Sequence, residues 1–132
     1  MLMSIPSDSL VQPWSPNPDQ AEPVEIWKAR KFIYEHSDEA LSLTKVAKSV
    51  HISPNYLSEK FKEVNGINFV EYVARRRFEK ACNLLSDVDL RISEIAFAVG
   101  FQSLSQFNRV FKKRSGKSPT EYRAVVQKRK RH

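Results

Sequence analysis

Two stretches of the chain carry hydrogen-bonding side chains at helical spacing, on segments that begin with strong helix-start signals. Amide and guanidinium groups can form paired hydrogen bonds with adenine or guanine edges, and lysine ammonium groups suit phosphates. This chemistry would read a nucleic acid rather than transform a substrate. Once the apolar positions are subtracted, the outward residues are Asn55, Ser58, Glu59 and Lys62 in the first stretch, and Ser105, Gln106, Asn108, Arg109 and Lys112 in the second.

The charge of the chain is uneven and favours a polyanionic partner. Residues 1–25 hold four acidic and no basic side chains, so all 22 Lys and Arg fall in the remainder. From Arg109 to the end there are ten basic residues and one acid. A dense basic flank, expected to contact phosphates together with Lys62, consists of Lys112, Lys113, Arg114 and Lys117.

No constellation in the sequence supports catalysis, a metal or a cofactor. His36 and His51 occur without an HExxH motif, a cysteine pair, a glycine-rich phosphate loop or GxSxG. The single Cys82 cannot form an internal disulfide and is expected to be a core residue. The N-terminus lacks signal-peptide features, and no stretch is long enough to span a bilayer. We therefore expect a cytoplasmic protein that is neither an enzyme nor bound to a membrane.

The spacing of apolar residues predicts an all-α fold. The proline-rich stretch 1–23 reads as a tail or linker. Apolar periodicity predicts a helix over 24–37, a short helix capped by Ser42, and a third helix capped by Ser53 and ended near Gly66. A long helix is predicted over 68–86, followed by a short helix from Ile92, and capping-box signals begin two more at Ser103 and Ser118.

The two halves of the chain repeat the same structural unit. Phe61, Lys62 and Gly66 recur 50 residues later, whereas upstream positions recur after 49, so the second turn is one residue longer. A short helix, a tight turn and a capped second helix form a helix-turn-helix, whose second helix enters the major groove. The predicted parts are a tail or linker (1–23), a first subdomain (24–67), a linker helix (68–86), a second subdomain (87–125) and a basic tail (126–132).

A 19-residue linker helix would span about 28 Å, close to the ~34 Å between major grooves on one face of a duplex. One chain could then occupy two successive grooves as a monomer. Because the outward residues of the two units differ, the DNA site should be asymmetric.

The stretch IAFAVGFQSLSQFNRVFKKRSGKSPTEYR, residues 95–123, resembles the AraC/XylS family of bacterial transcription regulators. It follows the family pattern I-A-x-x-x-G-F-x-x-x-S-x-F-x-R-x-F-K-K-x-x-G-x-S-P-x-x-Y-R. RRRFEKACNLL, residues 75–85, is similar to the family's linker helix, with Phe78 in place of a leucine. The resemblance covers about residues 24–125.

The resemblance implies seven helices in two homeodomain-like helix-turn-helix subdomains, promoter binding and, commonly, activation through contacts with RNA polymerase. The base-reading positions that it implies are Asn55, Ser58 and Glu59 in the first unit, and Leu104, Ser105, Gln106 and Arg109 in the second. Glu59 departs from the family's usual side chains: it either accepts from a cytosine amino group or weakens its half of the site.

Two alternatives stay open at this point. The same charge would serve a basic helical module that binds nucleic acid without reading its sequence. Most family members also carry an effector-binding or dimerisation domain, so residues 1–23 are either part of an interdomain linker or the tail of a stand-alone regulator. The target promoter, the inducing signal and the direction of regulation are not encoded in any readable pattern.

Overall fold

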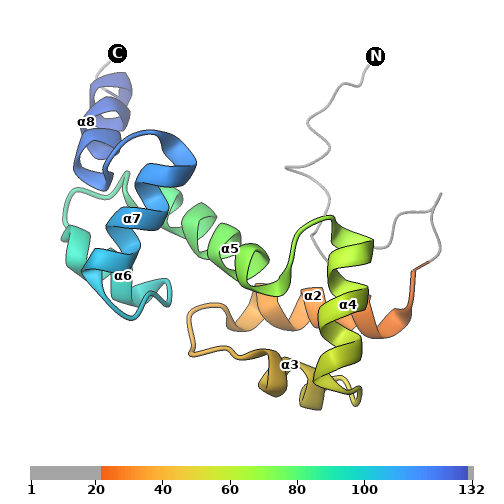
Figure 1. Ribbon diagram of the computed structural model, residues 1–132. Helices are drawn as coiled ribbons and strands as arrows, with labels where there is room; N and C mark the ends of the chain where they lie inside the picture. The colour runs from red at the N-terminus through yellow and green to blue at the C-terminus, as the bar shows by residue number, and fades with distance from the viewer. Residues whose placement is uncertain (1–21, 131–132) are drawn as a thin grey trace. The chain divides into compact units, whose positions relative to one another are not determined.

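The computed structural model describes residues 22–130, which fold into seven α-helices (Figure 1). No strand occurs in that range, and the predicted all-α class is confirmed. Nearly all of the predicted tail at 1–23, and the last two residues of the chain, lie outside it. The helices are α2 (Val24–His36), α3 (Leu43–Ser49), α4 (Pro54–Asn65), α5 (Phe69–Leu84), α6 (Ile92–Ala98), α7 (Leu104–Ser115) and α8 (Pro119–Lys130).

The described residues divide into two compact units, and the first comprises residues 22–36 and 41–69. Within it α2, α3 and α4 pack against one another. Each helix contributes apolar residues from one face, as the helical periodicity predicts, and together they close a core. The fully buried members are Ile26, Ala29 and Ile33 of α2, Val46 and Ala47 of α3, and Leu57 and Phe61 of α4.

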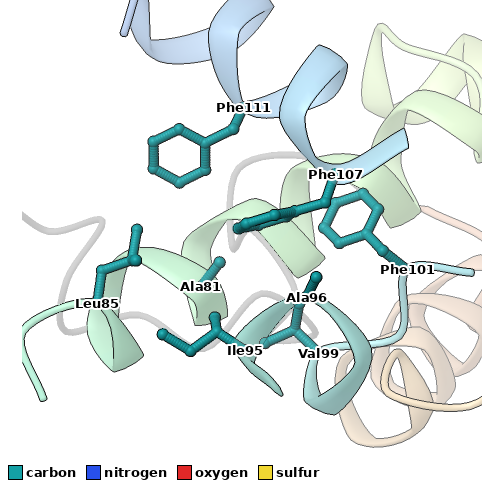
Figure 2. Close-up of a cluster of buried hydrophobic side chains, with 8 residues drawn as sticks. All are labelled: Ala81, Leu85, Ile95, Ala96, Val99, Phe101, Phe107 and Phe111. Carbon is teal, nitrogen blue, oxygen red and sulfur yellow. The ribbon is translucent and has the colours of Figure 1, made fainter. Parts of the chain in front are cut away.

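The second unit comprises residues 37–40 and 70–130, and its core draws on four helices. Figure 2 shows Ala81 and Leu85 from the α5 segment facing Phe107 and Phe111 of α7. The Phe111 ring also lies 4.8 Å from Phe78 and 5.2 Å from Tyr122 of α8, between ring centroids. The cluster consists of Ala81, Leu85, Ile95, Ala96, Val99, Phe101, Phe107 and Phe111.

Each of the two compact units has a core of its own. Each repeat buries its own apolar stripes, so each closes a small core. Cys82 is half-buried rather than fully buried. Burial raises the pKa of its thiol, and the Tyr122 hydroxyl is hydrogen-bonded to it.

The long helix is shorter than predicted, and the last helix is longer. α5 has 16 residues, about 24 Å at 1.5 Å per residue, and after Phe69 it groups with the second unit. α8 continues to Lys130, through most of the predicted basic tail. Its extension is supported by Gln127, whose side-chain amide donates to the Ser86 carbonyl at 2.9 Å.

Candidate nucleic-acid interface

The turns before α4 and α7 share one backbone hydrogen-bond pattern. The His51 and Ile52 N–H groups donate to the Lys48 and Ala47 carbonyls, at 3.2 and 3.1 Å. The equivalent pair in the second unit, from Gly100 and Phe101, measures 3.1 and 3.0 Å. Both turns are Schellman motifs, with His51 (φ 62°) and Gly100 (φ 108°) as the left-handed residues. The sequence did not predict this likeness, because histidine is an uncommon residue there.

The turn ahead of α7 is also held by a close approach of backbone within the second unit. The Arg77 guanidinium donates to the Ser37 and Glu39 carbonyls at 2.8 Å each. Burial lowers the pKa of Arg77. A Cβ atom at Gly100 would collide with the Ser37 carbonyl oxygen and lie 2.7 Å from Arg77 Nε. Glycine is therefore required at this position by both its φ angle and the space around it.

α4 and α7 are 12-residue helices with matching ends. The Ser53 and Ser103 hydroxyls accept from the Tyr56 and Gln106 N–H groups, at 3.1 and 3.0 Å, and confirm the predicted N-caps. Left-handed Gly66 and Gly116 end the helices, each donating its N–H at 2.8 Å to the carbonyl of Lys62 or Lys112. The capping box at Ser118 and Glu121, which begins α8, is also confirmed.

Most of the predicted site residues lie on the exposed faces of these two helices. Buried Leu57 and Phe61 fix the orientation of α4, and Phe107 and Phe111 fix that of α7. Leu104, which only the family resemblance indicated, is 39% exposed at the start of α7. The exposed residues are Asn55, Ser58, Glu59 and Lys62 on α4, and Leu104, Ser105, Asn108, Arg109, Lys112 and Lys113 on α7, with Lys117 just after it.

Two predicted site residues are already engaged by the protein. Gln106 is partly buried, and its side-chain oxygen accepts from the Gln102 N–H at 3.2 Å. Arg114 is paired with Glu71, donating to its carboxylate at 3.2 Å and to its backbone carbonyl at 3.0 Å. These contacts engage the side-chain oxygen of Gln106 and one nitrogen of Arg114. The predicted base contact of Gln106 and the predicted phosphate contact of Arg114 would therefore form in addition to these hydrogen bonds within the protein.

The two exposed faces differ in charge. On α4 the Lys60 ammonium is 2.9 Å from the Glu63 carboxylate, and this hydrogen bond raises the pKa of Lys60. α7 carries Lys112, Lys113 and Arg114 in its last turn and has no acid along its length, whereas α4 contains both Glu59 and Glu63. The second face is therefore the more positive.

Two exposed aromatic residues, one on α4 and one on α6, were not predicted from the sequence. Tyr56 is 40% exposed at the position of α4 that matches Gln106 of α7. Phe97, on α6, is 55% exposed and matches the exposed Lys48 of α3. The 49- and 50-residue offsets of the repeat would have identified both positions, because each replaces a polar side chain of the other unit.

The described part of the chain contains no group of three or more His, Cys, Asp or Glu side chains arranged to hold a metal ion. Within the same residues, no helix has both the length and the apolar character needed to cross a membrane.

Two short helix, turn and capped-helix units with polar outer faces define a helix-turn-helix protein. Residues 46–124 match the profile of a family described as "Helix-turn-helix domain". The chain belongs to the AraC/XylS family of transcriptional regulators.

Similar proteins include other regulators. The chain is 43% identical over 94 residues to the uncharacterized HTH-type transcriptional regulator YijO of Escherichia coli, covering 71% of this chain and 33% of that one. It is 37% identical over 99 residues to the melibiose operon regulatory protein of the same species, covering 75% and 33%. The chain thus spans about a third of the length of these curated relatives.

A solved structure has the same fold. It is the C-terminal domain of AraT, a response regulator from Geobacillus stearothermophilus, with a TM-score of 0.76 and 36% identity. The similarity covers 80% of this chain and 88% of that one.

Proposed function

We propose that this chain binds promoter DNA sequence-specifically, with α4 and α7 each laid in a major groove. The observation that carries the proposal is the pair of identically capped 12-residue helices, each of which buries two large apolar side chains and exposes a row of polar ones. Buried residues orient such a helix, and exposed ones near its start reach base edges. Family membership supports the same role.

Glu59 and Arg109 occupy the same position in the two helices, 50 residues apart, and both are exposed. A guanidinium donates paired hydrogen bonds to guanine O6 and N7, whereas a carboxylate accepts from the cytosine amino group. We assign Arg109 to a guanine and Glu59 to a cytosine. The remaining base readers are Asn55, Ser58, Leu104, Ser105, Gln106 and Asn108, and the phosphate contacts are Lys62, Lys112, Lys113, Arg114 and Lys117.

The two units would occupy adjacent major-groove segments of one asymmetric site as a monomer. Both readers belong to a single chain and carry different side chains, so a two-fold dimer is not needed to supply the second reader. Analytical ultracentrifugation on one duplex site tests the stoichiometry. Obligatory binding of two chains to a single short site would overturn the monomeric arrangement.

Selection of bound oligonucleotides in the presence of excess random DNA tests specificity, and a basic module without sequence preference would enrich no motif. On the selected site, Arg109→Ala should cost about 1–3 kcal/mol and relax preference at one base pair. Arg129→Ala, which removes an exposed arginine from α8, is the matched control. A loss for Arg109→Ala that is uniform over all single-base variants would place Arg109 on phosphate and contradict its assignment.

We further infer a cytoplasmic, nucleoid-associated protein that activates transcription through contact with RNA polymerase. The support is its kinship with bacterial transcriptional regulators. Transcription in vitro from a template with the selected site upstream of a weak promoter tests this role. Fewer transcripts in the presence of the protein would indicate a repressor instead.

A further inference from the structure

The first unit contains a buried arginine that the DNA-binding role does not use. Arg30, on α2, is 6% exposed. One terminal nitrogen donates to Glu22 at 2.9 Å and lies 2.7 Å from the second oxygen of that carboxylate. The other donates to the Asn65 side-chain oxygen at 3.0 Å. A guanidinium removed from water to this extent depends on its partners, because an unpaired buried charge is strongly destabilising.

Asn65 connects Arg30 to the backbone of α4, the first reading helix. It is the last residue of α4, and its side-chain NH₂ group donates to the Phe61 carbonyl at 2.9 Å. Phe61 is fully buried in the core. A continuous series of hydrogen bonds therefore runs from Glu22, two residues before α2 begins, through Arg30 to the C-terminal turn of α4.

The second unit satisfies the same helix end locally. Ser115 matches Asn65, and its hydroxyl lies 2.8 Å from the equivalent carbonyl, that of Phe111. The same hydroxyl also contacts the backbone of Lys117, two residues further on. These bonds stay within four residues of Ser115, whereas those of Arg30 join residues 8 and 35 positions away. The end of α7 also has a long-range contact, but it runs through Arg114 to Glu71 and not through the residue that matches Asn65.

We propose that Glu22 and Arg30 are positioning residues for α4, and that a displacement of the chain before α2 is transmitted through Asn65 to the first reading helix. The inference rests on the proposed function insofar as α4 reads DNA. If Glu22 moves away, the guanidinium loses the carboxylate that holds it from the N-terminal side, and its hydrogen bond to Asn65 is no longer fixed in place. This change loosens the last turn of α4 and does not act on α7.

Amide hydrogen exchange on the free protein tests the positioning role without DNA. The Gly66 and Gly116 N–H groups make matched 2.8 Å bonds at the ends of α4 and α7. Glu22→Gln should speed exchange at Gly66 about tenfold, and leave Gly116 unchanged, because local opening of one helix end does not require opening of the other. Glu25→Gln, on the first turn of α2, removes the same charge and is the control. Equal effects on the two glycines, or equal effects of the two variants, would overturn the proposal.

A second variant tests whether Asn65 carries the effect. Asn65→Ser installs the residue that the second unit uses, so the Phe61 carbonyl can be satisfied locally while the link to Arg30 is cut. In this background Glu22→Gln should no longer change exchange at Gly66. A response as large as in the parent chain would mean that α2 packing, rather than Asn65, connects the two ends, and the series of bonds would then have no positioning role.

Binding to the selected duplex completes the test. Glu22→Gln should weaken base discrimination in the half-site that Glu59→Gln affects and preserve it in the half-site that Arg109→Ala affects. Equal weakening in both halves would contradict the inference. If the parent chain selects no sequence at all, the proposed function fails, while the exchange experiment still decides whether Glu22 positions α4.

Discussion

Replacing Gly100 with alanine is the substitution whose cost the structure defines most closely. The residue has φ +108°, and an added Cβ would collide with the Ser37 carbonyl oxygen and lie 2.7 Å from Arg77 Nε. Either the turn before α7 opens, or Arg77 gives up hydrogen bonds to Ser37 and Glu39 that measure 2.8 Å each. Both responses disturb the support of α7.

The expected loss can be estimated from two contributions. Holding a non-glycine residue at an unfavourable positive φ costs on the order of 1–3 kcal/mol. Losing a charged hydrogen bond costs roughly 1.5–3 kcal/mol, and the lower end applies here because Arg77 is only partly buried. Gly100→Ala should therefore lower the free energy of unfolding by about 3–5 kcal/mol.

Gly116→Ala is the matched control. Its φ is +78°, and an added Cβ would meet nothing within 4 Å, so only the left-handed backbone penalty of about 1–2 kcal/mol applies. Urea unfolding followed by circular dichroism measures both variants. If Gly100→Ala is no more destabilising than Gly116→Ala, the close approach of residues 37–40 to this turn does not contribute to stability, and the reasoning is refuted.

Two further predictions concern the charged groups of the second unit. Removing Lys112 and Lys113 together should lower the slope of log affinity against log salt by about two. Lys60→Gln should change this slope less, because Lys60 is already paired with Glu63. Equal slopes for the parent chain and both variants would contradict the assignment of Lys112 and Lys113 to phosphates. Hydrogen bonds from Ser118 hold the pKa of Glu121 below its ordinary value of 4.5, so its stabilisation of α8 is present above that pH and is lost as pH falls through the lowered pKa. Glu121→Ala should therefore reduce amide protection in the first turn of α8 at neutral pH, and the difference from the parent should vanish in acid.

The features that could be predicted from the sequence are those set by neighbouring residues. Ser53 followed by Pro54, and Ser118 followed by Glu121, determine helix starts within one turn of chain, and both caps are present. The exposed face of α7 could likewise be predicted from its apolar spacing. A local pattern carries this information because the interacting groups are three or four residues apart.

The features that could not be predicted depend on distant partners. Arg114 pairs with Glu71, 43 residues earlier, and no local pattern indicates that pair. Arg77 and Gly100 meet the residues after α2, and no periodicity links those positions. The grouping of residues 37–40 with the second unit also emerged only from packing. Long-range polar contacts leave no periodic signal, because each needs only one suitable residue at each end.

Under the proposed function, the repeat also constrains which base pairs α4 and α7 would contact. α4 and α7 share their N-cap, their left-handed C-cap and their buried positions, so Glu59 and Arg109 are presented in the same register of equivalent helices. A carboxylate requires a donor such as the cytosine amino group, and a guanidinium requires the acceptors of guanine. These groups belong to the two partners of a single base pair. On the proposed function, Glu59 and Arg109 would thus contact opposite members of a G·C pair, each from the same position of its own helix.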